Sequence, residues 1–415
     1  PPPPAKKRRR RPRSSAPDDA GARAEIFARA RAALEEAKEL RDQHGKEMTR
    51  THTAQENGKL LKAADVLAAN ERAILAAAGP GRSGEERRLE VEEFKVYLQI
   101  LDLLATTHDD LNVEPSLAVK YYEQLLGYDK CAHLRTTNAT LEYEYCSGRL
   151  YSRTILVYRH QLQREDLARL TFEKATARTF NGYRVHWWPN EWQIPTLFMR
   201  GLRGQAFWEG LPLARALEAQ APLLRREFQA VMARKEYRDV FTQNDHSLIT
   251  AGSWGELKLY DGKEWKKPCA DAAPRTCAML HGRPELTGTF PTAQTHSVSL
   301  PKEAGYFKLL PGTRLKPHTG PVNFHLYCHL GLEVPEPGPK LRVGNGTPRS
   351  WQTGRALCFD DSFDHEAWHD GDEPRYVLMV TFWHPDLGTP GANPDAPALP
   401  IAKKRRRRRR RTGDL

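Results

Sequence analysis

The stretch from Val322 to Leu330 constrains the fold most, because its side chains alternate between two kinds. Apolar residues take every second position, and the positions between them are Asn323, His325, Tyr327 and His329. A two-residue period is typical of a β-strand with two different faces. Buried polar groups need hydrogen-bonding partners, which an apolar core does not provide. We therefore expect one face of this strand to pack on a core and the other to line a ligand cavity.

Two histidines lie on either side of this strand in the sequence, each in turn-like surroundings. His318 stands in a Pro-His-Thr-Gly-Pro sequence, and His365 follows 47 residues later. Neutral imidazole is the commonest metal ligand among protein side chains. The pair therefore indicates a metal site, although core histidines with satisfied hydrogen bonds would give the same pattern. His325 is expected to face the same cavity as His329 without binding the metal, and His369 is expected at the surface.

Arg375 opens a second apolar run, which ends at Trp383. A guanidinium at a strand end beside a metal pocket suits a carboxylate, which it can bind through two parallel hydrogen bonds. Imidazole ligands, open coordination positions and a cationic anchor for an oxo-acid are the parts of a non-haem iron oxygenase. Most such enzymes carry a carboxylate two residues after the first histidine. Here that position is Gly320, so two histidines must suffice, with water or a nearby acid completing the site.

Several short motifs in this region resemble the aspartyl/asparaginyl β-hydroxylase family. They are His318-Thr319-Gly320-Pro321, His329-Leu330-Gly331-Leu332, Phe359-Asp360-Asp361-Ser362-Phe363 followed by His365-Glu366, Trp368, and Trp383-His384-Pro385. The likeness runs from about Trp254 to Leu399, with weaker traces back to about Tyr183. It implies an Fe(II)- and 2-oxoglutarate-dependent dioxygenase built on a double-stranded β-helix, a jelly-roll or cupin-like fold.

The resemblance also implies roles for single residues. His318 and His365 match the two iron ligands of the family. His329 and Arg375 match the residues that bind the carboxylate of the cosubstrate, and Asp361 matches a carboxylate that holds a metal-bound water. The implied cofactors are Fe(II), 2-oxoglutarate and O2. The implied reaction hydroxylates a C–H bond, typically Cβ of an Asp or Asn residue in a protein or peptide substrate, and releases succinate and CO2.

Two positions depart from the pattern of the family. Phe307 stands four residues before Pro311, where the family usually has a serine that helps to hold the cosubstrate. Tyr327 stands two residues before His329, where animal members have an arginine that reads the carboxylate of the substrate. The first departure bears on cosubstrate affinity and the second on substrate identity. A catalytically inactive, cupin-like binding module is therefore the alternative to an enzyme.

The rest of the chain divides by composition, and the predicted fold class is α+β. Residues 1–21 are expected to be a disordered basic arm. Residues 22–180 are rich in Ala, Glu, Arg, Lys and Leu at helical spacing and are expected to be mostly helical. The dioxygenase-like domain would occupy residues 181–401, and residues 402–415 would form a disordered basic tail.

One amphipathic helix is expected inside that domain, from Leu211 to Arg234, before the first strand of the β-core. Its predicted buried stripe is Leu213, Leu217, Leu223, Phe228 and Val231. The first strand is expected from Trp254 to Tyr260, where apolar and polar residues alternate.

The net charge of +12 comes from the two ends of the chain. Residues 6–13 carry seven Lys or Arg and residues 403–411 carry nine, so the remainder would have a net charge of −4. Such runs are typical of nuclear-import signals or of arms that contact nucleic acid or another polyanion, and a low-complexity extension is the alternative. A nuclear oxygenase acting on a nucleic-acid-associated protein is thus a further hypothesis. No stretch reaches the roughly 18 to 20 apolar residues of a membrane helix, so no membrane segment is expected.

The six cysteines are spread over the chain and do not form a dense framework. Cys269 and Cys277 are the exception, because the segment around them is similar to one that carries a disulfide in the family. A disulfide indicates an oxidising compartment such as the endoplasmic reticulum, whereas the basic ends indicate the nucleus. The sequence alone leaves the compartment open.

Overall fold

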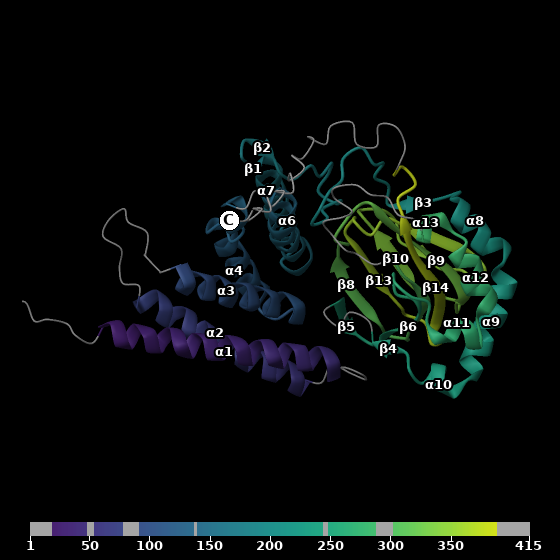
Figure 1. Cartoon of the computed structure of the whole chain (residues 1–415), viewed down its shortest axis with the longest axis horizontal. Coiled ribbons are helices and arrows are strands. Elements are labelled where there is room, and N and C mark those ends of the chain that lie inside the picture. Colours follow the sequence, from purple (N-terminus) through teal and green to yellow (C-terminus); the bar gives the residue numbers. More distant parts are fainter. Residues whose placement is uncertain are drawn as a thin grey trace, which may run out of the picture. The chain divides into compact units, whose positions relative to one another are not determined.

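The computed structural model of the chain describes residues 19–47, 54–77, 91–136, 139–243, 248–287 and 302–387 (Figure 1). The chain divides into two compact units, of which the second comprises Glu47–His52 and His108–Leu415 and holds all the candidate site residues. The basic runs at residues 6–13 and 403–411 lie outside the described residues. Their predicted contact with nucleic acid or another polyanion therefore stays a prediction.

The first unit, which comprises Pro1–Lys46 and Thr53–Thr107, is helical where it is described. It holds α1 (Asp19–Glu47), α2 (Ala54–Ala77) and most of α3 (Val91–Leu111). The buried side chains recur at three- and four-residue steps, as in Ala30, Leu34 and Ala37 of α1. This is the spacing that predicted helices for this part of the chain. Among the helices described here and below, none is long and apolar enough to cross a membrane.

The second unit opens with more helices. These are α4 (Pro115–Gly127), α5 (His133–Thr136), α6 (Thr140–Leu156), the π-helix η1 (Val157–Gln161) and α7 (Glu165–Ala177). The short hairpin β1 (Thr179–Phe180) and β2 (Tyr183–Arg184) follows them. The π-helix continues α6 directly, and Leu162 donates from its backbone N–H to the carbonyl of Val157 at 3.0 Å. Single π-turns of this kind are frequent at functional sites.

Two antiparallel sheets follow in the second unit. The larger has the order β3 (Phe207–Trp208), β12 (Ala356–Phe359), β9 (His325–Glu333), β14 (Arg375–Trp383), β7 (Ala304–Leu309), β6 (Trp254–Tyr260) and β4 (Thr242–Gln243). The smaller has the order β11 (Arg349–Ser350), β10 (Lys340–Val343), β13 (His365–Trp368), β8 (Arg314–His318) and β5 (Ile249–Ala251). The strands predicted at Trp254–Tyr260 and Arg375–Trp383 are thus confirmed, and the chain is a mixed helix-and-sheet protein as predicted.

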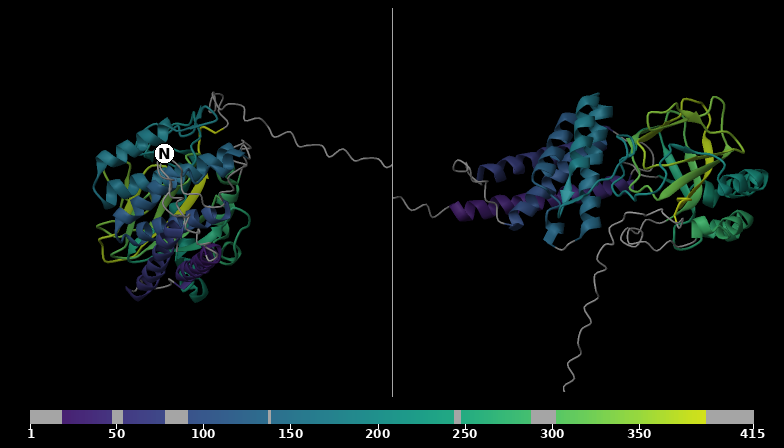
Figure 2. Two further views of the ribbon diagram at one scale, coloured as in Figure 1. Left: turned by 90° about the vertical axis from the view of Figure 1, so that its left-hand side faces the viewer. Right: turned by 90° about the horizontal axis from the view of Figure 1, so that it is seen from above.

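Helices cover one face of the larger sheet. They are α8 (Pro212–Ala219), α9 (Ala221–Ala233), α10 (Lys235–Arg238), α11 (Lys267–Asp271), α12 (Pro274–His281) and α13 (Pro284–Thr287), and Figures 1 and 2 show α8, α9 and α12 gathered beside the sheets. Leu326, Cys328 and Leu330 of β9 pack against them in one buried cluster. Phe307 and Met379, on the other face of the larger sheet, share a second cluster with the smaller sheet. The apolar side of the alternating strand therefore packs as predicted.

The helix expected from Leu211 to Arg234 is interrupted at Gln220. Pro222 has no backbone N–H to continue the hydrogen-bond ladder, so the chain starts a new helix with this proline in its first turn. The restart shifts the helical phase. Leu224 is fully buried and Leu223 only partly, so the predicted stripe was wrong at that position.

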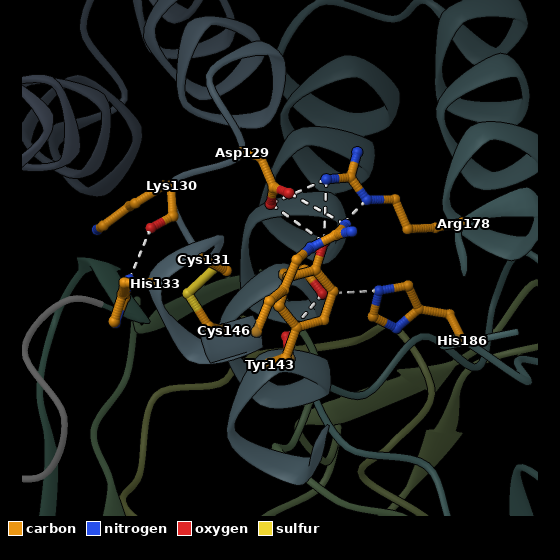
Figure 3. The surroundings of a disulfide bond; sticks show 10 residues. Asp129, Lys130, Cys131, His133, Tyr143, Cys146, Arg178 and His186 are labelled. Atoms are coloured by element: carbon orange, nitrogen blue, oxygen red, sulfur yellow. Dashed lines mark hydrogen bonds and ion pairs between the residues drawn. A yellow bond between two sulfur atoms is a disulfide. The ribbon is translucent and has the colours of Figure 1, made fainter. Parts of the chain in front are cut away.

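All six cysteines form disulfides in the described part of the chain. The bonds are Cys131–Cys146, Cys269–Cys277 and Cys328–Cys358. The second of them is the bond that the family resemblance predicted. Figure 3 shows Cys131–Cys146 beside a polar cluster in which Arg178 pairs with Asp129 at 2.9 Å and donates to the Tyr143 hydroxyl at 3.0 Å. The other two pairings were not predicted.

We expect no reactive thiol in the chain when it is folded under oxidising conditions. Alkylation of the denatured, unreduced protein should add no label by mass spectrometry, and alkylation after reduction should add six. Labelling of one cysteine pair without reduction would show that the corresponding bond does not form.

Candidate functional site

The strand pairing of the smaller sheet brings the two predicted metal ligands together. Strands β8 and β13 are antiparallel, and His318 lies directly opposite His365. The centroids of the two imidazole rings are 4.1 Å apart. Both rings line a cavity of about 1010 Å³, which is also lined by Tyr327, His329 and Arg375.

Both imidazoles are oriented by a backbone carbonyl two residues earlier in the chain. Nδ1 of His318 lies 2.7 Å from the carbonyl oxygen of Lys316, and Nδ1 of His365 lies 2.8 Å from that of Phe363. A carbonyl can only accept, so each Nδ1 carries the proton. Each Nε2 therefore keeps its lone pair, which is the arrangement of a metal-binding histidine held by an outer hydrogen bond.

Burial keeps these imidazoles neutral. It lowers the pKa of His318 to about 4 and the pKa of His365 to about 3, because a charged ring loses its hydration in the interior. Neutral imidazole is the form that binds metals. Among the described residues no group of three or more His, Cys, Asp or Glu side chains is placed to hold a metal, so the two histidines stand without a third protein ligand of these types.

Asp361 occupies the space that a side chain at position 320 would need. A Cβ on Gly320 would lie 1.8 Å from Asp361 Oδ2, and the Gly320 N–H donates to the Asp361 carbonyl at 2.6 Å. The Oδ1 atom of this buried carboxyl has no hydrogen-bond partner among the described residues. Burial, with the charge of Asp360 added, raises the pKa of Asp361 well above its ordinary value. A cation or a water beside Oδ1 would satisfy the group.

His329 and Arg375 form a second polar pair in the cavity. Trp351 Nε1 donates to Nδ1 of His329 at 3.2 Å, so in the neutral ring the proton is on Nε2. That Nε2, and Nε and Nη1 of Arg375, have no hydrogen-bond partner among the described residues. Burial lowers the pKa of Arg375 to about 9, so the guanidinium is still a cation at neutral pH. A buried cation and an N–H donor without acceptors together favour a bound anion.

Asp364 lies immediately before His365 and is fully buried. His160 Nε2 lies 2.6 Å from its Oδ2, Arg159 Nη1 lies 3.6 Å from the same oxygen, and Arg342 Nη2 lies 3.3 Å from Oδ1. Burial would raise the pKa of Asp364, but the hydrogen bond from His160 and these charges lower it below its ordinary value. No pattern in the sequence predicts this cluster, because His160 lies 204 residues away in the chain.

Not every residue expected in the cavity lies there. Tyr327 lines it, whereas His325 is buried beside Trp383, with ring centroids 4.6 Å apart. The side chain of Asn323 is also absent from the cavity, because it hydrogen-bonds the backbone N–H and carbonyl of Met199 at 2.7 and 2.8 Å. The alternating strand begins only at His325, so its predicted polar face was too long.

Two further expectations concern Phe307 and His369. Phe307 is buried in the core, 6.1 Å from Trp254 between ring centroids, and does not line the cavity. His369 was expected at the surface, and this was wrong. It is fully buried, with Nε2 2.7 Å from the carbonyl oxygen of Glu373 and Nδ1 accepting from the N–H of Gly371 at 3.2 Å. Both ring nitrogens of His369 are thus hydrogen-bonded to backbone groups of the turn that follows it.

Comparison with known proteins identifies the segment that carries this site. Residues 218–385 match the family model described as aspartyl/asparaginyl beta-hydroxylase. Human aspartyl/asparaginyl beta-hydroxylase is 33% identical over 223 residues, which are 52% of this chain and 28% of that protein. Mouse aspartate beta-hydroxylase domain-containing protein 1 is 48% identical over 174 residues, 41% of this chain and 45% of that protein. The resemblance stated from the sequence is confirmed.

Two further comparisons give other proteins with some similarity. The ornithine lipid ester-linked acyl 2-hydroxylase of Rhizobium tropici is 34% identical over 180 residues, 42% of this chain and 58% of that protein. Among solved structures, a prolyl-4-hydroxylase of Pseudomonas putida matches 44% of this chain and 92% of its own at 14% identity, with a TM-score of 0.26. The chain spans less than two thirds of the length of each of these three sequence relatives.

The contact between Gly320 and Asp361 gives the first prediction. In a Gly320→Ala variant the methyl group displaces the Asp361 carboxyl, and metal affinity should fall by about tenfold or more, the effect typical of disturbed outer-shell partners. Equilibrium dialysis against Co(II) measures this. Gly127→Ala is the matched control, because a Cβ there meets no heavy atom within 4 Å. Equal affinities of the two variants would contradict the assigned packing.

The depressed pKa of His365 predicts how stability depends on pH. Its folded pKa of about 3 lies below the unfolded value of about 6.5, so the unfolded chain takes up the proton first as pH falls. The contribution of His365 thus lowers the free energy of unfolding by about 1.4 kcal/mol for each pH unit below 6.5. Between pH 6.5 and 5, metal-free His365→Gln should lose about 2 kcal/mol less unfolding free energy than the unsubstituted chain.

Urea unfolding in the presence of a chelator at both pH values checks this prediction. The exposed His133 supplies the control His133→Gln, which should follow the unsubstituted chain. If the curves for His365→Gln and the unsubstituted chain stay parallel over this pH range, His365 is not held neutral by burial.

Proposed function

We propose that this chain, whose residues 218–385 form a domain of the aspartyl/asparaginyl β-hydroxylase family, is an Fe(II)- and 2-oxoglutarate-dependent dioxygenase. Its reaction hydroxylates a C–H bond, at Cβ of an Asp or Asn residue in a protein or peptide substrate, and releases succinate and CO2. The proposal rests on one cavity that holds two kinds of polar group without a binding partner. Two fixed imidazoles offer lone pairs to a metal, and a buried cation with an N–H donor requires an anion.

The two sheets support a more specific fold. The seven-stranded and five-stranded antiparallel sheets share a core that includes Phe307, Met379, Leu315 and Val343. We describe this pair of sheets as a double-stranded β-helix with the metal site at its open end. Strands β8 and β13 of the smaller sheet would supply the metal ligands, and β9 and β14 of the larger sheet would supply the anion site.

The residues present fit a ferrous ion. Imidazole suits iron, and a site with few protein ligands leaves coordination positions open for a cosubstrate and a gas. His318 and His365 would hold the metal through Nε2, the atom that their Nδ1 bonds leave free. When bound, Fe(II) with 2-oxoglutarate and O2 supplies the oxidising equivalents that decarboxylate the cosubstrate and hydroxylate the substrate.

Asp361 would act beside the metal. Its Oδ1 lacks a partner, and the absence of a side chain at Gly320 leaves room for the carboxyl there. A carboxylate in this place can accept a hydrogen bond from a water that completes the metal site and can hold that water in one orientation. A nearby divalent cation also favours ionisation of the carboxyl, which burial alone opposes.

Arg375 and His329 would bind the far carboxylate of 2-oxoglutarate. Nε and Nη1 of the guanidinium have no hydrogen-bond partner in the described structure, so the cation can donate hydrogen bonds to carboxylate oxygens placed in the cavity. Nε2–H of His329 adds a third donor without adding charge, because burial and the Arg375 charge lower the pKa of His329 well below its ordinary value. Trp351 fixes both groups, since it donates to His329 and lies 4.7 Å from the guanidinium carbon.

The remaining part of the cavity would receive the substrate. Tyr327 is stacked on Phe359 with ring centroids 5.8 Å apart, so the wall next to the metal histidines is aromatic at the position where animal members have an arginine. Phe307 lies in the core and not in the cavity, which supports a cosubstrate site that this residue does not fill. The alternative of an inactive binding module is therefore tested by turnover and not by the presence of Phe307.

Succinate release from 2-oxoglutarate tests the proposed activity. With Fe(II), ascorbate and O2, the purified chain should turn over 2-oxoglutarate slowly even without substrate, and His318→Ala and His365→Ala should reduce this by at least about 100-fold, because each loses one of only two protein ligands. His133→Ala is the control and should match the unsubstituted chain. Turnover by His318→Ala at the unsubstituted rate would refute the site, and absence of turnover in the unsubstituted chain would support the binding module.

Arg375→Ala should act on the cosubstrate and not on the metal. The KM for 2-oxoglutarate should rise by about tenfold or more, since a charge-assisted hydrogen bond to a buried carboxylate is worth about 1.5 to 3 kcal/mol, while the Fe(II) requirement changes little. Arg375→Lys keeps the charge but not the planar guanidinium, so its KM for 2-oxoglutarate should lie between those of Arg375→Ala and the unsubstituted chain. Equal shifts in both requirements would argue against the assigned role.

A further inference from the structure

We infer that His160, on the π-helix η1, is a positioning residue of the metal site, which acts through Asp364 on the adjacent metal ligand His365. The inference rests on the proposed function only in taking His365 as a ligand. It adds a part of the chain that the family match does not include, because His160 lies outside residues 218–385. The helical segment α6–η1 is then a structural component of the metal centre.

The Asp364 carboxylate connects the helical segment α6–η1 to His365. It is fully buried, and its shortest side-chain contact is the 2.6 Å bond from His160 Nε2 to Oδ2. Its backbone is held as well, because its N–H donates to the carbonyl of Trp192 at 2.7 Å and its carbonyl accepts from Gly344 at 2.8 Å. Side chain and main chain are thus fixed from three separate segments of the fold.

The position of Asp364 directly affects the position of His365. His365 follows Asp364 in the chain, and the carbonyl of Phe363, on the other side, holds Nδ1 of His365. The segment from Phe363 to His365 therefore determines both the backbone position of His365 and the rotation of its imidazole ring. Movement of the Asp364 side chain would be transmitted to Nε2 of His365 through the one peptide unit that joins the two residues. Loss of outer contacts around a metal ligand typically changes metal affinity 10- to 100-fold.

The π-helix is itself built to hold His160 still. Arg159, the preceding residue, donates to Glu165 at 2.9 Å and to the carbonyl of Glu191 at 3.0 Å, and its guanidinium carbon lies 4.0 Å from the centre of the Trp192 ring. Adjacent helical residues ordinarily point about 100° apart. Here both Arg159 and His160 reach the same Asp364 oxygen, and the residues between α6 and α7 adopt the wider π-turn.

The charge balance predicts that the fold survives loss of His160. Arg342 and Arg159 stay within 3.3 and 3.6 Å of the Asp364 carboxylate, so the buried charge is not left alone when the imidazole is removed. These two cations, which also pair with Glu366 and Glu165, compensate part of the charge, whereas the short bond from His160 fixes the direction of the carboxylate. Substitution of His160 should therefore affect metal affinity more than stability.

The test compares metal binding by full-length His160→Ala, His160→Gln and the control His133→Ala with the unsubstituted chain. Dialysis against Co(II) gives the dissociation constant, and the Co(II) absorption spectrum reports the geometry of the ligands. His160→Ala should bind Co(II) about 10- to 100-fold more weakly, with an altered spectrum. His160→Gln, whose amide can still donate to Asp364, should recover most of the affinity, and His133→Ala should not differ from the unsubstituted chain.

The outcomes separate this inference from the proposed function. If the unsubstituted chain binds no metal, the proposed function fails, and this inference fails with it. If the unsubstituted chain binds Co(II) and His160→Ala binds it equally well with the same spectrum, only the inference is overturned. It is also overturned if both His160 variants lose affinity and thermal stability in parallel, because His160 would then serve the fold and not the ligand.

Discussion

The antiparallel pairing of β8 with β13 is the interaction on which the site depends. It sets His318 opposite His365, and a slip by one residue would turn one of the two rings to the other face of the sheet. Carbonyls from the same two segments then fix each ring with its Nε2 lone pair free. The orientation of the two imidazole rings is thus determined by backbone contacts, without help from a third side chain.

The second constraint is electrostatic. Arg375 is 2% exposed and has donors without acceptors among the described residues, and an unpaired buried cation is costly. An anion in the cavity removes that cost. The carboxyl of Asp361 presents the opposite case, since burial raises its pKa and a nearby cation would favour its ionised form. The cavity would therefore suit a metal and an acid together, which is the pairing that the proposed Fe(II)- and 2-oxoglutarate-dependent reaction requires.

Sequence reasoning succeeded where the signal is local. The period of two predicted β6 and an apolar run predicted β14, both with their observed bounds, and the family resemblance indicated five residues that lie around one cavity. It failed where distant contacts decide: Asn323 is bound to the backbone of Met199, and two of the disulfides join segments without a recognisable pattern. It also failed for His369, whose ring is hydrogen-bonded within its own turn. The bond from His160 to Asp364 could not be predicted, because no spacing rule connects a helix with a loop residue 204 positions away.

The most direct test of the account is anaerobic equilibrium dialysis of Fe(II) with and without 2-oxoglutarate. The account predicts one tightly held Fe(II) per chain, tighter still with 2-oxoglutarate, because the cosubstrate would bind the metal and Arg375 together. In Arg375→Ala the iron should remain and the effect of 2-oxoglutarate should disappear. Iron that is absent from the unsubstituted chain, or retained equally when both His318 and His365 are replaced, would contradict the two-histidine site.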